Sequence, residues 1–165
     1  MSSPAELPDI AEALAGLLQR VPPTERPLLV ALAERLAAER YRAWAREVTK
    51  PADSAALLAC AEREEEIARR VEALSPESAS MQRDLVARNP DLLEINQSLF
   101  APYSLDQQLV LQSRGERLGA ATWRSFARHE QSVERRDVFL SCALLEEESA
   151  TVLESLAPRG GTESR

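Results

Sequence analysis

Four glutamates occupy positions where a helix would normally carry an apolar residue. In residues 57–74, the positions spaced three and four apart form a stripe in which Glu64 is the only charged side chain; its other members are Leu57, Cys60, Ile67, Val71 and Leu74. Glu34, Glu116 and Glu146 interrupt similar stripes in three other segments. This spacing predicts that each of four helices directs one carboxylate into the protein core.

Carboxylates gathered in a core need compensation for their charge. Burial and mutual repulsion both disfavour the ionised form and raise the pKa. A bound pair of divalent cations removes that cost, since carboxylate oxygens are good ligands and bridges for hard cations. The alternative is that the stripes line a wet groove, or that some of these glutamates are protonated or paired with arginine. We interpret the pattern as a metal site with the candidate ligands Glu34, Glu64, Glu116 and Glu146.

An internal repeat relates the four glutamates in pairs. Residues 33–46 match residues 115–128, and residues 58–68 match residues 140–150, both at an offset of 82. Other side chains recur at the same offset, as the pairs Cys60/Cys142, Tyr41/Trp123 and Trp44/Phe126. Matches of this kind predict a duplicated helical hairpin.

The helices expected to carry the glutamates follow from apolar periodicity and capping residues. We expect hairpins at residues 24–75 and 104–157, joined by a crossover of residues 76–103 with room for one or two short helices. Within each hairpin the two glutamates lie at similar distances from the turn, so all four should share one level. The expected helix N-caps are Thr24, either Asp53 or Ser54, and Ser104, whose spacing to Gln107 fits a capping box. Residues 1–23 should form an N-terminal amphipathic helix, and residues 158–165 a disordered tail.

Composition agrees with an all-α chain and excludes several classes of partner. The chain has 165 residues, which suits one bundle domain, with only 4% aromatic residues and five glycines. A net charge of −7 argues against nucleic acid or an anionic membrane as the main partner. Residues 1–9 lack the features of a signal peptide, and no stretch approaches a membrane span. Two cysteines without CxxC spacing fit a reducing environment, so we expect a cytoplasmic protein.

These residues resemble the ferritin-like superfamily, and rubrerythrin-type domains in particular. Glu34 followed seven residues later by Tyr41 resembles the first-helix ligand and its associated tyrosine, and Glu116 and Glu146 resemble the ligands of the second half. The resemblance covers roughly residues 27–157. It implies a four-helix bundle of two pseudo-symmetric hairpins joined by a long crossover, with a di-iron or di-manganese site between them.

The sequence departs from this family at the histidines. The second and fourth helices of the family carry Glu-x-x-His pairs, but this chain has Ile67 and Ser149 where the two histidines would stand. Its single histidine, His129, lies thirteen residues beyond Glu116, too far along the helix to replace them, and we expect it at the surface or in a helix cap. Further carboxylates that could complete the ligand set are Glu39, Glu65 and Glu147, although their helical angles lie off the stripes.

The sequence therefore supports one main hypothesis and two alternatives. The main hypothesis is a carboxylate-only dinuclear site for iron or manganese, with an oxidase- or peroxidase-like redox role. The side chains expected around it are Tyr41, Trp123, Cys60, Cys142 and Ser149, with the cysteines on opposite sides of the glutamate layer and too far apart for a disulfide. The first alternative is a metal-free helical scaffold or interaction module; in either case we expect a homodimer. The second is a core that holds a small organic ligand, for which a cavity beside Gly119 would be the sign.

Overall fold

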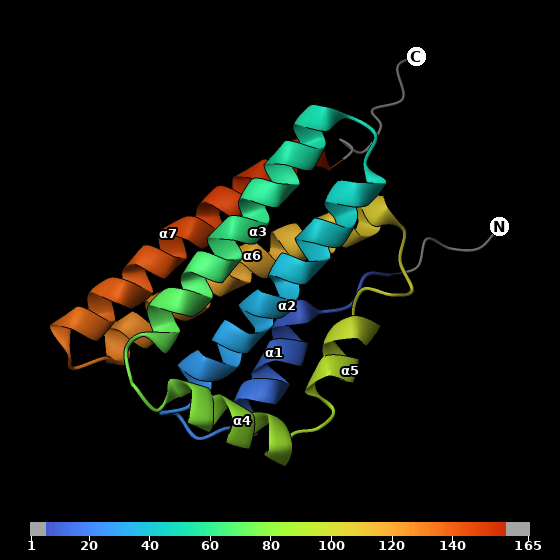
Figure 1. Ribbon diagram of the computed structural model, residues 1–165. Helices are drawn as coiled ribbons and strands as arrows, with labels where there is room; N and C mark the ends of the chain where they lie inside the picture. Colours follow the sequence, from blue (N-terminus) through green and yellow to red (C-terminus); the bar gives the residue numbers. More distant parts are fainter. Residues whose placement is uncertain (1–5, 158–165) are drawn as a thin grey trace.

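The computed structural model describes residues 6–157, and these residues form helices without any strand (Figure 1). The all-α prediction is confirmed. The helices are α1 (Ile10–Gln19), α2 (Arg26–Glu47), α3 (Pro51–Glu72), α4 (Ser78–Arg88), α5 (Leu92–Ser98), α6 (Leu105–His129) and α7 (Val133–Leu156). The tail predicted at residues 158–165, like residues 1–5, lies outside the described residues.

Capping residues explain where the two helices of the second hairpin begin. Ser104 and Gln107 form both hydrogen bonds of the predicted capping box at the start of α6. At the start of α7, the Ser132 hydroxyl accepts a hydrogen bond from the backbone N–H of Arg135. Helix α6 therefore starts at its predicted position, and α7 starts directly after Ser132.

The caps predicted for the first hairpin were wrong. The N-cap of α2 is Glu25 rather than Thr24, and its side chain makes no capping bond. Helix α3 begins at Pro51, before the two residues predicted to cap it, because proline at the first helical position needs no N–H partner and already has a helical φ. Ser54 instead donates a hydrogen bond to the carbonyl of Ala45 and so joins α3 to α2.

The two long hairpins, α2–α3 and α6–α7 (Figure 1), have equivalent ion pairs between their helices. Arg35 pairs with Glu72 across the first hairpin, and Arg117 with Glu154 across the second. Arg42 likewise pairs with Glu65 across the first hairpin, and Arg124 with Glu147 across the second. Each exposed ion pair contributes about 1 kcal/mol at most. Their recurrence at the repeat offset nevertheless shows that both hairpins align their helices in the same way.

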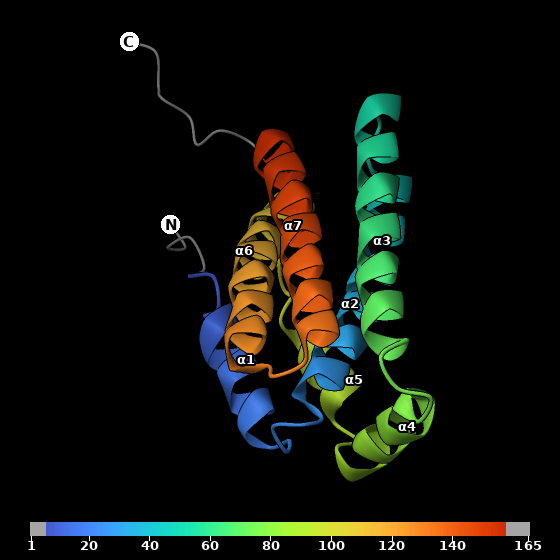
Figure 2. The same cartoon turned by 90° about the vertical axis from the view of Figure 1, so that its left-hand side faces the viewer.

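The hairpins pack together more closely on one side than on the other. Helices α3 and α7 contact each other at more points than α2 and α6 do. Figure 2 shows α7 between α6 and α3. The predicted crossover contains α4 and α5, and α4 packs against α2. Helix α1 lies against α6. Helix α1 and the part of the crossover around Asn96 thus lie on the side where the long helices are less closely packed.

The apolar core is divided in two by the layer that contains the glutamates. One cluster includes Ile67, Trp123, Phe139 and Cys142, and the other includes Tyr41, Trp44, Leu57 and Cys60. The two cysteines are buried free thiols in different clusters, as predicted. Among the described residues, no helix is both long and apolar enough to cross a membrane.

Candidate metal centre

Each of the four long helices contributes one buried glutamate to the middle of the molecule. The exposed fraction is 7% for Glu34 on α2, 0% for Glu64 on α3, 1% for Glu116 on α6 and 1% for Glu146 on α7. A carboxylate at such a position loses its hydration, so it requires a proton, a cation or hydrogen-bond donors. The apolar stripes correctly predicted that these side chains point inward.

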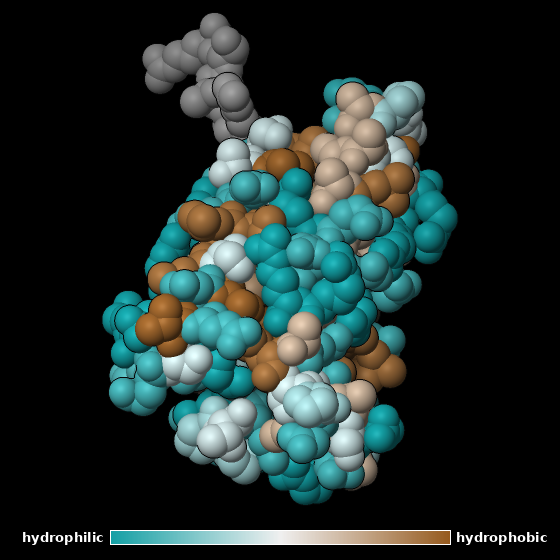
Figure 3. Space-filling view, turned by 60° about the vertical axis from the view of Figure 1, so that its left-hand side comes forward, coloured by the Kyte–Doolittle hydropathy of each residue, from teal (hydrophilic) through white to brown (hydrophobic). Residues whose placement is uncertain are grey.

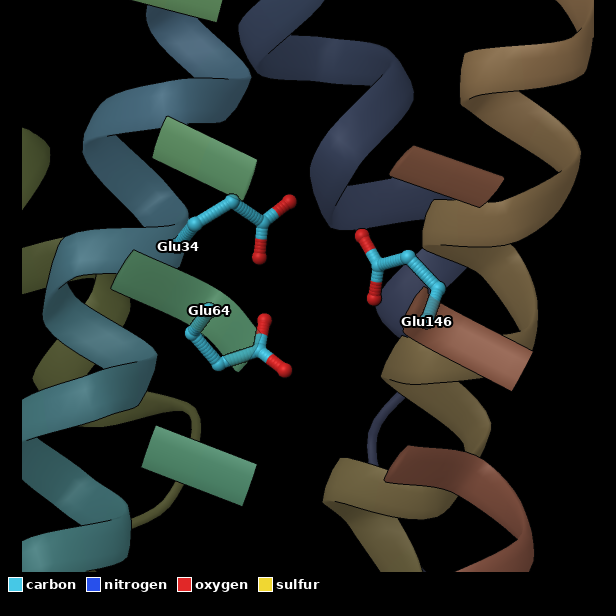
Figure 4. Close-up of side chains that lie close together, drawn as sticks. All are labelled: Glu34, Glu64 and Glu146. Carbon is cyan, nitrogen blue, oxygen red and sulfur yellow. The ribbon is translucent and has the colours of Figure 1, made fainter. Parts of the chain in front are cut away.

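Three of these carboxylates converge on one point. Oxygen atoms from Glu34, Glu64 and Glu146 all lie within 4.8 Å of one another. In the close-up, Glu34 and Glu64 extend from one hairpin and Glu146 faces them from the other (Figure 4). Two oxygens bound to one cation at roughly 2.0–2.6 Å are at most about 5 Å apart. The trio is therefore spaced so that one cation could contact all three carboxylates.

Glu116, the fourth predicted ligand, belongs to the same layer but not to this trio. Its Oε1 accepts two hydrogen bonds of 2.6 Å, from the Tyr41 hydroxyl and from Nε2 of Gln112. Its Oε2 has no hydrogen-bond partner among the described residues, and the same holds for Oε2 of Glu64. Unpartnered oxygens at buried carboxylates are rare because their desolvation is costly. Oxygens of this kind have lone pairs available to coordinate a bound cation.

The predicted neighbours of the site divide into those that contact a carboxylate and those that do not. Trp123 donates its indole N–H to Oε1 of Glu146 at 2.9 Å, and Tyr41 donates to Glu116 as described. Within residues 6–157, no hydrogen bond joins Cys60 or Cys142 to a carboxylate. The cysteines are therefore packing residues next to the layer.

Ser149 occupies the position at which a Glu-x-x-His pair beginning at Glu146 would carry its histidine, and it acts there as a donor. Its hydroxyl donates to Oε1 of Glu64 at 3.1 Å and accepts a hydrogen bond from Nε of Arg63, also at 3.1 Å. Ser149 thereby links Arg63 to the Glu64 carboxyl group through two hydrogen bonds. Ile67, the equivalent position after Glu64, is fully buried in the apolar core.

The remaining candidate residues lie away from the site. Glu39 and Glu65 both pair with Arg42, and Glu147 pairs with Arg124. His129 is exposed at the end of α6, where its Nδ1 contacts the carbonyl of Ser125. These positions agree with the helical angles that placed the three glutamates off the stripes and with the predicted surface position of His129.

Burial dominates the electrostatics of the site. It raises the pKa of Glu34 to about 7, an effect partly offset by hydrogen bonding with Glu64. Burial, followed by the charges of neighbouring glutamates, raises the pKa values of Glu64 and Glu146 well above their ordinary range. Without a cation, the site must therefore hold protons at neutral pH.

Gly119 provides the space that the Glu146 carboxylate occupies. A Cβ atom added at Gly119 would lie 2.4 Å from Oε1 and 2.8 Å from Oε2 of Glu146. Such contacts are too short for any side chain, so this glycine forms a cradle for the carboxylate. Together with the all-oxygen donor set and the unpartnered oxygens, the cradle fits a site for a hard divalent cation.

Sequence reasoning missed four polar residues that support or border the site. Arg63 carried no signal, because its contact with Ser149 depends on how the hairpins pack. Gln112 already stood on the α6 stripe as a polar member, which was a usable clue. Arg40 and Asn96 contact each other and line a cavity that borders the carboxylates. Only the loss of the repeat at Arg40, which corresponds to Thr122, could have suggested a special role.

Replacing Gly119 with alanine should displace the Glu146 carboxylate and weaken metal binding at least tenfold without unfolding the protein. Alanine favours the helix by up to ~1 kcal/mol, which offsets part of the steric cost. The matched control is Gly115→Ala, one turn earlier on α6, where an added Cβ has no atom within 4 Å. Metal titrations of both variants, monitored by calorimetry, provide the test. Equal affinities for the two variants would contradict a role for Gly119 as a cradle.

Compared with known proteins, the chain matches no family model, no curated protein and no solved structure. Its function therefore has to be inferred from the chemistry of the buried carboxylates and of the residues around them.

Proposed function

We propose that this chain is a ferritin-like protein of the rubrerythrin type that binds iron or manganese in a carboxylate site. Glu34, Glu64 and Glu146 would hold the metal, and Glu116 would serve as the fourth carboxylate. The observation that carries the proposal is the convergence of three buried carboxylates within 4.8 Å of one another. Carboxylates are buried in this way when a cation or shared protons compensate their charge.

Several features of the fold support the ferritin-like part of the proposal. The two long hairpins share one register, and the crossover between them contains two short helices. Each long helix supplies one glutamate, and Tyr41 contacts the glutamate layer. The family places its ligands in the same manner, on the facing helices of two related hairpins.

Charge balance favours two divalent cations. The four glutamates would carry four negative charges when ionised, and two divalent cations would neutralise them. A single divalent cation would leave two charges for protons to neutralise, and the raised pKa values show that the glutamates can take up protons at moderate pH. A site without histidine favours hard cations, which include Mn²⁺.

The chain's own residues would orient the carboxylates and control their protons. Burial raises the pKa of the Tyr41 phenol well above its ordinary value, so this group stays protonated and donates to Glu116. Ser149 and Trp123 fix the orientation of one oxygen each on Glu64 and Glu146. When bound, iron or manganese would supply one-electron redox chemistry, which we propose to be oxidase- or peroxidase-like.

Elemental analysis tests the proposal directly. The protein should be purified without an affinity tag or chelator, exchanged into Mn²⁺- or Fe²⁺-containing buffer under anaerobic conditions, and freed of excess metal. One to two bound metal ions per chain are expected, and anomalous diffraction should place them between the four long helices. Less than a tenth of an ion per chain under both conditions would overturn the proposal.

A second candidate function, a helical interaction module that forms a homodimer, is favoured by one surface observation. Leu58 on α3 and its repeat counterpart Leu140 on α7 are 46% and 42% exposed, and Leu144 on α7 is 58% exposed. Figure 3 shows apolar patches between hydrophilic ones on the face that comes forward from the α7 side of Figure 1. Two buried free thiols suit the cytoplasmic localisation that we propose along with this function.

The dimer is expected to depend on the exposed leucines Leu58, Leu140 and Leu144. Light scattering should show a dimer for the native chain and a monomer for the Leu140→Gln/Leu144→Gln variant, because the change removes apolar area from the contact. Leu93→Gln on α5 is the matched control, since Leu93 is equally exposed at 51% but lies on the crossover. A native chain that is monomeric at 0.1 mM would contradict this prediction.

A further inference from the structure

A cavity borders the carboxylates on the side where the two hairpins are less closely packed. Its volume is about 120 Å³, and it lies between α1, α2 and α6. Glu34, Glu116 and Glu146 line one part of it. Helix α1 supplies an apolar wall that includes Ile10, Leu14 and Leu17. We call this cavity the α1 pocket. It gives a ligand a place next to the proposed metal site.

The α1 pocket contains one positive charge, from Arg40. The guanidinium stacks on the Phe100 ring at 3.9 Å and donates hydrogen bonds to Asn96 Oδ1 and to Gln112 Oε1, at 2.5 and 3.0 Å. None of the ion pairs within residues 6–157 includes Arg40. Its hydrogen-bond partners are neutral amides, so its charge has no direct counterion.

Arg40 also has donor capacity left for a ligand. A guanidinium has five N–H groups in a fixed fork. Nε and one N–H on Nη2 bind Gln112, and one N–H on Nη1 binds Asn96, which leaves two N–H groups. Burial lowers the pKa of Arg40 only to about 10, so the group is charged at neutral pH. It can therefore offer a charge-assisted hydrogen bond to an anion.

The internal repeat accounts for the buried glutamates but not for the positive charge of Arg40. The counterparts of Arg40 and Gln112 in the other copy are Thr122 and Val30. Asn96 on α5 and Phe100 just beyond that helix both belong to the crossover, which occurs once. A cluster required only to hold a hairpin together would be expected in both copies, as the repeated ion pairs are. The polar cluster around Arg40 is an addition on the pocket side.

Charge and size together define the kind of ligand that the α1 pocket would take. Four ionised glutamates, two divalent cations and Arg40 would leave one net positive charge, which one monoanion would balance. The volume of about 120 Å³ is somewhat smaller than a cavity of roughly 150 Å³ that holds benzene. A ligand of about six non-hydrogen atoms is therefore near the upper limit.

We propose that the α1 pocket binds a small monocarboxylic acid, with its carboxylate toward Arg40 and the metal-holding glutamates and its short carbon chain against Ile10, Leu14 and Leu17 of α1. This inference rests on the proposed metal function, because the bound cations turn a negative pocket into one that attracts an anion. It also assigns α1 a role as the apolar wall of a binding site, while leaving the four-glutamate metal site complete without it.

Calorimetry on the Mn²⁺-loaded full chain tests the inference with butyrate as the probe. Butanol and butylammonium have the same carbon chain with neutral and positive ends, and octanoate is too long for the cavity. Butyrate should bind at least tenfold more tightly than butanol or octanoate, with no detectable binding of butylammonium. The Arg40→Gln variant should lose at least tenfold in butyrate affinity. Equal affinity for butyrate and butanol, or an unchanged Arg40→Gln variant, would overturn the inference.

A second variant fills the pocket without touching any charge. Gly115 lines the α1 pocket, and an added Cβ there meets nothing within 4 Å, so Gly115→Leu should fold well and occupy the cavity. Gly16→Leu is the matched control, because Gly16 is equally unobstructed but does not line the pocket. Gly115→Leu should abolish butyrate binding while Gly16→Leu retains it; retention by both would place any binding elsewhere and overturn the inference.

Metal content, measured in the same samples, separates the two proposals. A chain that holds one to two Mn²⁺ ions but does not prefer butyrate contradicts only the ligand proposal. A chain that holds no Mn²⁺ contradicts the metal function and, with it, the charge balance on which the ligand proposal rests.

Discussion

Metal-free protein is expected to lose stability as the pH rises from about 4.5 to above 7, and Mn²⁺ should restore that stability at pH 8. The reason is the protonation of the buried glutamates. Burial raises the pKa of Glu34 from 4.5 to about 7, and it raises the pKa values of Glu64 and Glu146 in the same direction. At pH values between the ordinary glutamate pKa of 4.5 and these raised pKa values, the folded protein binds more protons than the unfolded chain. The free energy of unfolding therefore falls with increasing pH.

The size of the effect follows from the shift at Glu34. A change of one pKa unit corresponds to about 1.4 kcal/mol, so Glu34 alone should contribute about 3 kcal/mol, fully present below pH 4.5 and lost above about 7. Glu72 and Glu130 have pKa values lowered by their arginine partners and by hydrogen bonding, so their contribution is lost only on acidification below about 4.5. The pH ranges of these two effects do not overlap. Above pH 4.5, the slope of the free energy of unfolding against pH therefore reports the protonation of the buried glutamates.

Urea denaturation in EDTA at pH 5, 6, 7 and 8 measures this slope. Repeating the pH 8 series with excess Mn²⁺ should raise the free energy of unfolding, because a ligand that binds only the folded state stabilises it. The Glu34→Gln variant is the internal control and should show a shallower slope. A stability that is constant or rises between pH 5 and 8 in EDTA would contradict protonated glutamates in the folded state.

Replacing Glu64 with glutamine should have opposite effects on metal binding and on metal-free stability. Glu64 is fully buried and has one oxygen without a partner. Glutamine is neutral and a poor ligand, so we expect metal affinity to fall at least 100-fold. In EDTA at pH 8 the same change should raise stability by several kcal/mol, because it removes a buried ionisable group whose desolvation is costly.

The adjacent residue provides a matched control for this variant. Glu65 has the same side chain but pairs with Arg42 at the surface, so Glu65→Gln should change stability by about 0.5 kcal/mol or less and leave metal binding intact. Metal content by elemental analysis and unfolding by urea are measured on both variants. If Glu64→Gln destabilises the metal-free protein and binds metal normally, the carboxylate has a structural role and the metal function is wrong.

Local sequence information predicted the helices better than their first residues. Ser104 and Ser132 carry hydroxyls that can accept from nearby backbone N–H groups, so the starts of α6 and α7 were predictable. At the start of α3, by contrast, Pro51 competes with the polar residues that follow it. A proline at the first helical position satisfies the same requirement without any side-chain bond, and sequence alone did not show which solution would be used.

Local sequence information also predicted which glutamates are buried, but not how their oxygens are distributed. A symmetric repeat would lead one to expect equivalent roles for Glu34 and Glu116. Instead, Glu34 joins the convergent trio, while Glu116 accepts from Tyr41 and Gln112. Trp123, the counterpart of Tyr41, donates within its own hairpin to Glu146. The indole of Trp123 is larger than the phenol of Tyr41, and the counterpart of Gln112 is the apolar Val30, so the two halves are not equivalent. The effect of these differences depends on contacts between helices far apart in the chain.

The buried glutamate layer was thus determined by the sequence itself, and the α1 pocket was decided only by the tertiary structure. Helical periodicity specifies which face of each helix points inward, and the repeat offset places Glu34 and Glu64 at the same positions as Glu116 and Glu146. Periodicity does not specify how far apart two helices lie, because that distance depends on side chains from both helices and on the elements that cover them. Close packing of α3 with α7, sparse contact of α2 with α6 and the position of α1 created a cavity beside the carboxylates.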